Sequence, residues 1–304
     1  MNKIFAAVFA AALVIATLAN IKPVYAEAVQ ITDNGMKLNG KLVLADGRKL
    51  SEGVVLMVHG TLAHHGMETI SNLQTVLVER GYNTLAISLS LGISDRKGMY
   101  DCTKPSRHRH TDALDEISIW MNWLKTKDVN NVVLLGHSRG GNQVAWYMSE
   151  RADPAIKRLV LLAPATWNAK DAEEGYARRH KKELAESVAK AEALVAKGQG
   201  ETMMKKIGLL YCADADATAA SFVSYYKPDT RFDTPSLLAR IKTPVQVIAG
   251  EKDTVVTGLT ERIPALADGK KLRFAVVEDA DHFFLDLLAE DVADIIEEFV
   301  SPGG

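Results

Sequence analysis

The stretch VVLLGHSRGGNQVAWYM, residues 132–148, places a serine at the corner between two apolar patterns. An aliphatic run ends at Gly136, and the spacing predicts a helix from Gln143 onward. A buried strand that turns sharply into a helix leaves no room for side chains beside the turn, so glycine is needed there. Ser138 is therefore expected to be strained and exposed at the carboxyl end of a sheet. Such a serine needs a base, and the base needs an acid.

Candidate partners follow this serine in the order acid, then histidine. Asp253 and His282 each stand in a loop that follows an apolar run. Loops after parallel strands open at the same edge of a sheet, so the three side chains are expected to meet there. Glu251, nearer to the strand end, and Asp281, beside the histidine, stay open as alternatives to Asp253.

A second loop with a glycine supplies hydrogen-bond donors. The apolar run 54–58 leads into His59-Gly60-Thr61, where glycine lets the backbone bend inward. The backbone N–H groups of Thr61 and Arg139 are therefore expected to bind a developing oxyanion. His59 and His137 flank glycines of the site and are interpreted as supports for it.

The wider pattern predicts an α/β fold. Six apolar runs, mostly continuous rather than alternating, are typical of strands buried on both faces of a parallel sheet. They span residues 54–58, 84–89, 132–135, 159–162, 245–249 and 272–277. A hairpin is predicted over 28–32 and 36–44, and helix-spaced segments separate the later runs. This alternation favours a mostly parallel, doubly wound sheet with helices on both faces.

Residues 165–240 interrupt the alternation and contain no convincing buried strand. Residues 170–197 are rich in Ala, Glu, Lys and Arg, and a narrow apolar stripe predicts one solvated amphipathic helix. We interpret 165–240 as a helical insertion over one end of the sheet. The core domain would then comprise residues 27–164 and 241–304.

These motifs resemble those of the α/β-hydrolase family. The resemblance covers nearly the whole mature chain and rests on VVLMVHGT (54–61), GHSRG (136–140), GEKD (250–253) and DADHFF (279–284). It implies Ser138 as the nucleophile, Asp253 as the acid and His282 as the base. It also implies Thr61 and Arg139 as backbone oxyanion donors, and residues 165–240 as a cap over the site.

These roles predict acyl transfer to water through an acyl-enzyme on Ser138, with a small or medium carboxylic ester as substrate. Thioesterase, lipase, peptidase and acyltransferase activities need the same residues and stay open. A non-catalytic binding protein on the same fold is a further alternative. No cofactor is expected. Arg107, Arg109 and the Arg139 side chain are candidates for favouring an anionic substrate.

Histidines elsewhere in the chain raise the question of a metal. They are His64, His65, His108 and His110. Because none matches a spaced zinc motif, no metal is expected, and we interpret these histidines as parts of solvated loops.

The N-terminus is typical of an export signal. Residues 1–26 carry Lys3, an apolar run from Ile4 to Leu18 and the pattern Val24-Tyr25-Ala26. The run is shorter than the roughly 20 residues of a membrane-spanning helix, which favours a cleaved signal peptide over an uncleaved anchor. A periplasmic or extracellular location is expected.

Export and charge bear on partners and on the cysteines. In an oxidising compartment Cys102 and Cys212 could pair, and two free buried thiols are the alternative. The formal charge of −2 gives no indication of nucleic-acid binding. The sequence does not determine the oligomeric state.

Overall fold

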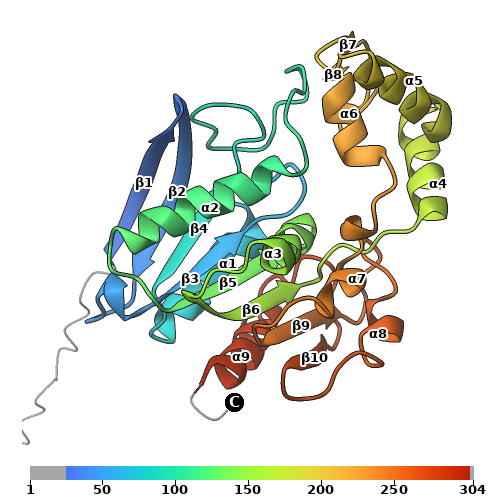
Figure 1. Ribbon diagram of the computed structural model, residues 1–304. Coiled ribbons are helices and arrows are strands. Elements are labelled where there is room, and N and C mark those ends of the chain that lie inside the picture. The colour runs from blue at the N-terminus through green and yellow to red at the C-terminus, as the bar shows by residue number, and fades with distance from the viewer. Residues whose placement is uncertain (1–24, 302–304) are drawn as a thin grey trace, which may run out of the picture.

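The computed structural model describes residues 25–301, and the predicted signal peptide lies outside the described residues except for Tyr25 and Ala26. The strands of its main sheet are β1 Tyr25–Asp33, β2 Met36–Leu44, β3 Val54–Val58, β4 Thr84–Ser88, β5 Val132–His137, β6 Ile156–Leu162, β9 Val245–Gly250 and β10 Leu272–Val277. They follow the order β1-β2-β4-β3-β5-β6-β9-β10 (Figure 1). The β1–β2 and β2–β4 pairs are antiparallel, and the other pairs are parallel.

The predicted hairpin is present as β1 and β2. Asn34 and Gly35 at the turn have φ angles of 46° and 81°. Positive φ at both central residues is what a tight two-residue hairpin turn requires, and Asn-Gly is the sequence best suited to it. The six later strands match the six apolar runs, with differences of at most a few residues at their ends.

Helices cover both faces of the sheet, as the fold class predicts. They are α1 Glu68–Glu79, α2 Asp112–Lys125, α3 Arg139–Glu150 and α9 Leu288–Val300. Because successive side chains of a strand point to opposite faces, β3 contributes to two separate cores. Leu56 and Val58 pack in the core that includes α2 and α3. Val55 and Met57 pack in the core that includes α1 and α9.

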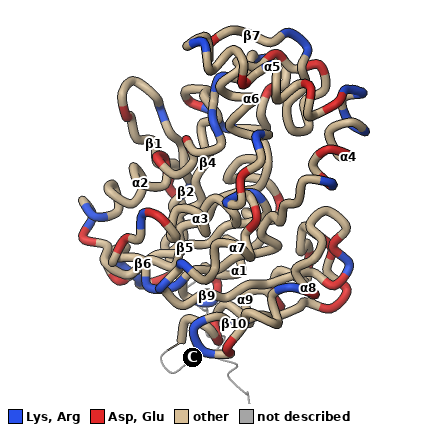
Figure 2. The backbone as a smooth tube through the Cα atoms, turned by 45° about the vertical axis from the view of Figure 1, so that its right-hand side comes forward, with Lys and Arg blue, Asp and Glu red and all other residues tan. Residues whose placement is uncertain are grey.

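The insertion between β6 and β9 holds most of the remaining elements. They are α4 Ala169–His180, α5 Leu184–Ala196, β7 Met203–Met204, β8 Ala217–Thr218, α6 Ala219–Tyr226, η2 Thr230–Phe232 and α7 Thr234–Leu238. Two short elements lie elsewhere, namely η1 Leu50–Glu52 and α8 Leu259–Arg262. Figures 1 and 2 show α4, α5 and α6 standing apart from the sheet, and Figure 2 shows acidic and basic residues interleaved along α4 and α5.

The single helix predicted over 170–197 is wrong, because the chain turns between α4 and α5. Lys181, the C-cap of α4, has a left-handed backbone with φ 55°. No glycine or proline marks this turn in the sequence. The predicted apolar stripe is present on α5, where Leu184, Val188 and Ala191 are buried while Val195 is exposed.

One apolar cluster is built mostly from the insertion, with Leu62 and Tyr100 of the core, and it ends before residue 240. Tyr176, Val188 and Phe222 belong to this cluster, and its last member along the chain is Tyr226. The following residues, including Leu237, pack instead in the main core beside α3. We call residues 169–226 the cap segment. On this packing we propose that the cap ends near Tyr226, whereas the sequence analysis expected it to end at residue 240.

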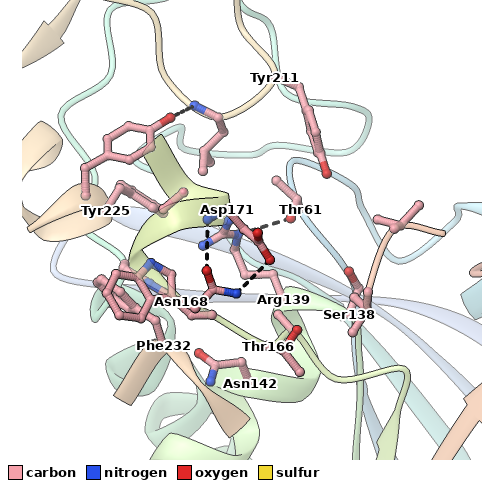
Figure 3. Close-up of a pocket in the computed structure, with 18 of the residues that line it drawn as sticks. Thr61, Ser138, Arg139, Asn142, Thr166, Asn168, Asp171, Tyr211, Tyr225 and Phe232 are labelled. Atoms are coloured by element: carbon pink, nitrogen blue, oxygen red, sulfur yellow. Dashed lines mark hydrogen bonds between the residues drawn. The ribbon is translucent and has the colours of Figure 1, made fainter. Parts of the chain in front are cut away.

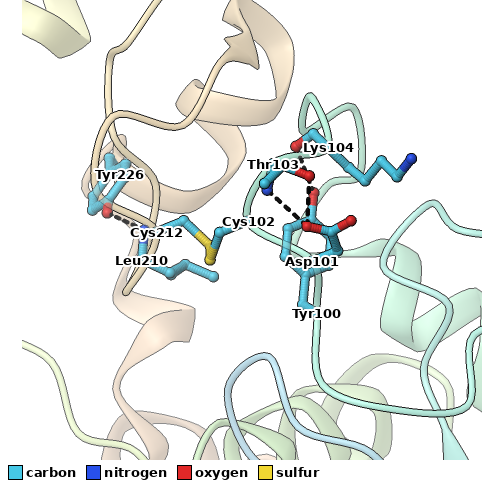
Figure 4. Close-up of a disulfide and its surroundings, with 8 residues drawn as sticks. All are labelled: Tyr100, Asp101, Cys102, Thr103, Lys104, Leu210, Cys212 and Tyr226. Atoms are coloured by element: carbon cyan, nitrogen blue, oxygen red, sulfur yellow. Dashed lines mark hydrogen bonds between the residues drawn. A yellow bond between two sulfur atoms is a disulfide. The ribbon is translucent and has the colours of Figure 1, made fainter.

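A disulfide joins the cap segment to the core. Cys102, in the loop after β4, is bonded to Cys212, with 5.2 Å between their Cα atoms (Figure 4). The sequence left open a disulfide or two free, buried thiols, and the structure has the disulfide. Among residues 25–301, no helix is both long and apolar enough to span a bilayer.

Candidate active site

Ser138 occupies a strained corner between β5 and α3. Its φ of 57° and ψ of −122° are unusual for a residue with a side chain. Helix α3 begins at Arg139, so the predicted start at Gln143 is wrong. Glycines stand on both sides of Ser138, Gly136 in β5 and Gly140 in the first turn of α3, because strand and helix pack closely there. A Cβ on Gly136 would lie 2.4 Å from the Gly140 carbonyl oxygen, and one on Gly140 would lie 2.3 Å from the His59 carbonyl oxygen.

The structure brings Ser138, His282 and Asp253 into one hydrogen-bonded chain. The Ser138 Oγ lies 2.9 Å from the His282 Nε2. The His282 Nδ1 lies 2.8 Å from the Asp253 Oδ2. A carboxylate only accepts, so Nδ1 carries the proton and Nε2 is free to accept from the serine hydroxyl. Ser138 and His282 are both buried, so the expectation that Ser138 is exposed is wrong. Their burial shields the three hydrogen-bonded side chains from bulk water.

Asp253 is held as an anion. Its Oδ1 accepts hydrogen bonds from the amides of Val255 and Val256, at 2.7 and 2.9 Å. Burial by itself would raise the pKa of Asp253, but the hydrogen bonds from His282 and from these two amides leave the pKa below its ordinary value. The carboxylate is therefore charged at neutral pH and can stabilise a protonated His282.

Neither alternative acid bonds the His282 ring in the structure. The Glu251 carboxylate accepts from the Asp279 amide, and the Asp281 carboxylate accepts from the Phe283 amide. Of the three candidate acids, Asp253 alone has the geometry to orient the histidine.

The two loops expected to supply oxyanion donors meet beside Ser138. The Arg139 Nε donates to the Thr61 Oγ1 at 3.1 Å, which fixes one loop against the other. The His59 Nδ1 lies 2.8 Å from the Gly60 carbonyl oxygen and donates to it. In a trans peptide the carbonyl and the following N–H point in opposite directions, so this bond turns the Thr61 N–H away from His59. The Arg139 N–H is one of the free first-turn amides of α3.

His59 and His137 hold the surrounding backbone. The His59 Nε2 accepts from the Leu89 amide at 3.0 Å, and the His137 Nε2 donates to the His282 carbonyl oxygen at 2.9 Å. Burial lowers the pKa of each ring to about 3, so both are neutral. A neutral ring can donate at one nitrogen and accept at the other. His59 does both, whereas His137 donates at Nε2 and its Nδ1 has no partner among the described residues.

A cavity of about 240 Å³ opens beside Ser138 (Figure 3). Its lining includes Thr61 and Arg139 from the core and Tyr211 from the cap segment. Aromatic rings from several segments also contribute, namely His110, Trp167, Tyr225, Tyr226 and Phe232. No pattern in the sequence predicted that these aromatic rings line the site, because they come from separate loops and helices that only the tertiary fold brings together.

The interpretation of His108 and His110 as solvated is wrong. They are 2 % and 1 % exposed because the loop before α2 packs beneath α6. The His108 Nδ1 lies 2.8 Å from the Tyr225 hydroxyl. His64 and His65 are partly buried, and His65 hydrogen-bonds the Ser88 hydroxyl at 2.7 Å. In the part of the chain that the structure describes, no group of three or more His, Cys, Asp or Glu side chains is arranged to bind a metal.

The arginines expected to favour an anionic substrate separate into two groups. Arg107 and Arg109 lie near Glu201 at the surface, with N–O distances of 3.4 and 3.9 Å, and neither lines the cavity. Arg139 lines it, as does Arg179 of the cap segment. A role in substrate binding is therefore open to Arg139 and not to the other two candidates.

A doubly wound sheet with this serine, histidine and aspartate at the carboxyl ends of its strands defines a hydrolase-like α/β protein. The family model described as "Alpha/beta hydrolase family" matches residues 55–295. The chain belongs to the alpha/beta hydrolase family.

Known proteins agree with this assignment. The chain is 23% identical over 127 residues to "Putative esterase/lipase 3" of Mycoplasma pneumoniae, and the match spans 40% of either chain. The structure of Est1E from Butyrivibrio proteoclasticus with ferulic acid is similar at a TM-score of 0.63 and 19% identity, over 90% of this chain and 97% of that one. The monoacylglycerol lipase of Paleococcus ferrophilus gives 0.59 and 20%, over 86% and 98%. At these identities the structural likeness shows the fold alone.

Proposed function

We propose that this protein is a serine hydrolase that cleaves carboxylic esters through an acyl-enzyme on Ser138. The observation that carries the proposal is the hydrogen-bonded chain from Ser138 through His282 to Asp253, at the edge of a cavity. The similarity to a protein described as a putative esterase/lipase favours an ester over other acyl substrates.

The proposed reaction uses each group in turn. The His282 Nε2 takes the hydroxyl proton as the Ser138 Oγ attacks the ester carbonyl, and Asp253 stabilises the resulting imidazolium. The N–H groups of Thr61 and Arg139 bind the negative oxygen of the tetrahedral intermediate. His282 then gives its proton to the leaving alcohol. Water, deprotonated by the same nitrogen, attacks the acyl-enzyme and releases the acid.

Hydrolysis of 4-nitrophenyl acetate tests this proposal. Ser138→Ala is expected to lower kcat by roughly 10⁴-fold or more, since the nucleophile is gone. Ser149→Ala is the matched control, because Ser149 lies on the same helix and donates only to the Trp146 carbonyl. Equal rates for wild type and Ser138→Ala would contradict the proposal.

Matched substrates distinguish an esterase from a thioesterase or a peptidase. An ester, a thioester and an anilide of the same acid share the acyl group and differ only in the bond cleaved. We expect the highest kcat/KM for the ester. A higher value for either of the others would assign the protein to that activity instead.

We also propose that the protein is exported, with residues 1–26 removed as a signal peptide. The sequence pattern of those residues and the Cys102–Cys212 disulfide support this, since disulfides persist in oxidising compartments. N-terminal sequencing of the protein recovered from an expressing cell is expected to begin at Glu27. A chain that retains Met1 after export would contradict cleavage.

A further inference from the structure

One wall of the cavity carries buried polar atoms that no described group satisfies. Both ring nitrogens of His110 and the Oδ1 of Asn142 lack a hydrogen-bond partner. Both residues line the cavity that holds Ser138, and each is only 1 % exposed. A buried polar atom without a partner is costly, so a group bound in this cavity would gain by bonding these atoms. We call His110 and Asn142 the polar pair.

Both side chains of the polar pair are fixed before any ligand arrives. The His110 ring stacks on Tyr225 and on Phe232, with centroids 5.3 and 5.1 Å apart and interplanar angles of 5° and 13°. The Asn142 Nδ2 donates to the Arg231 carbonyl oxygen at 2.9 Å, which assigns the other amide atom as the unpaired oxygen. Figure 3 shows Asn142, Phe232 and Tyr225 across the cavity from Ser138.

The unpaired atoms select a particular chemistry. Burial, reinforced by the charge of Arg139, lowers the pKa of His110 well below its ordinary value, so the ring is neutral. A neutral imidazole offers one donor and one acceptor, and the Asn142 Oδ1 is a second acceptor. At the polar pair itself, a carboxylate, which only accepts, would face two acceptors. An ammonium group would face the charge of Arg139. A hydroxyl both donates and accepts, and it carries no charge.

We infer that the group entering this cavity carries a hydroxyl, which His110 and Asn142 bind while its carbon skeleton contacts the rings of Tyr225 and Phe232. The inference rests on the proposed esterase function and names its substrate class, the esters of hydroxylated acids or hydroxylated alcohols. His110 and Asn142 are then specificity-determining residues. A site built to bond a hydroxyl discriminates against the analogue without one, because its own polar atoms stay unpaired.

Two pairs of esters test the inference and show which side of the ester carries the hydroxyl. The acyl pair is methyl 3-(4-hydroxyphenyl)propanoate and methyl 3-phenylpropanoate. The alcohol pair is 2-(4-hydroxyphenyl)ethyl acetate and 2-phenylethyl acetate. In one of the pairs, kcat/KM is expected to favour the hydroxylated ester by about tenfold or more. Hydrolysis of all four esters with ratios near one would overturn the inference and leave the esterase proposal intact. Hydrolysis of none would contradict the esterase proposal itself.

A variant links the preference to the polar pair. His110→Phe keeps an aromatic ring between Tyr225 and Phe232 and removes both nitrogens. The preference for the hydroxylated ester is expected to fall by about three- to tenfold, the usual effect of losing one neutral hydrogen bond. His64→Phe is the control and keeps the wild-type ratio, because His64 does not line the cavity. An unchanged ratio in folded His110→Phe, checked by thermal unfolding, would overturn the role of His110. If that variant does not fold, the wild-type ratios decide alone.

Discussion

At the scale of single residues, Asp253 sets the tautomer of His282. Asp253→Asn would place an amide donor against Nδ1, and the ring would then carry its proton on Nε2, where it cannot accept from Ser138. We expect kcat to fall by about 10⁴-fold. Glu251→Gln is the control and keeps kcat, because Glu251 bonds only the Asp279 amide. Steady-state hydrolysis by the three proteins checks this, and a larger loss for Glu251→Gln would contradict the assignment.

The sequence predicted the residues of the hydrogen-bonded chain but not those of the cavity. Ser138, Asp253 and His282 each follow a strand of the parallel sheet, so their position along the chain determines their position in space. His110 and Phe232 instead meet because separate loops pack against one another. That packing depends on the tertiary fold and leaves no periodic pattern in the sequence.

At the scale of elements, the start of α3 depends on close backbone packing. A Cβ on Gly140 would lie 2.3 Å from the His59 carbonyl oxygen, so helix and loop would have to separate. Gly140→Ala is expected to cost about 1–3 kcal/mol of stability, and it moves the Arg139 amide away from Thr61. Thermal unfolding and the rate of ester hydrolysis measure these two effects. Gly98→Ala has open space around the added methyl group and is expected to change neither. Equal stability for the two variants would contradict this packing.

Helix α2 carries a carboxyl group that makes stability depend on pH. Glu116 is buried and accepts from the Ser90 amide at 2.7 Å. Burial raises the pKa of Glu116 from 4.5 to about 7, so the folded state holds the proton more tightly than the unfolded state. Its contribution to stability is therefore fully present below pH 4.5 and is lost as the pH rises through 7.

Replacing this carboxyl group tests the sign of the effect. Glu116→Gln removes the titration. Between pH 5 and pH 8, the variant is therefore expected to lose less unfolding free energy than the wild type, by up to about 3 kcal/mol. The measurement is chemical unfolding of both proteins at the two pH values. Asp115→Asn, next to it on the exposed face of α2, is the control. A greater loss of stability between pH 5 and pH 8 in Glu116→Gln than in the wild type would contradict the argument.

Strands were easier to predict than the cap helices. Buried strands appear as continuous apolar runs, and β3 and β10 coincide with the predicted ranges. The turn between α4 and α5 falls at Lys181, a residue type that gives no sign of a left-handed backbone. Helix periodicity continues through such a turn, so only the tertiary structure reveals it.

At the scale of the whole molecule, the disulfide connects the cap segment to the core. Cys102 and Cys212 are 110 residues apart. Closing a loop of this length is worth about 4–5 kcal/mol in the chain-entropy model. We therefore expect the melting temperature of Cys102→Ala/Cys212→Ala to be well below that of the wild type. A reducing agent is expected to lower the melting temperature of the wild type and leave that of the double variant unchanged. Equal melting temperatures without reductant would contradict a stabilising bond.

The overall architecture was predictable, whereas the meeting of distant segments was not. The order of strands and helices indicated a doubly wound sheet. In such a sheet, buried apolar strands alternate along the sequence with the amphipathic helices that connect them. The cysteine pairing stayed open, since spacing alone does not show that two residues approach within bonding distance.

The most direct test of the account is covalent labelling of the folded protein with a fluorophosphonate, followed by mass spectrometry of its peptides. Such a probe reacts with a serine that a neighbouring base activates. The account predicts a single adduct on Ser138, a much slower reaction in Asp253→Asn and no adduct in Ser138→Ala. An adduct on another serine, or no labelling of the folded wild-type protein, would contradict it.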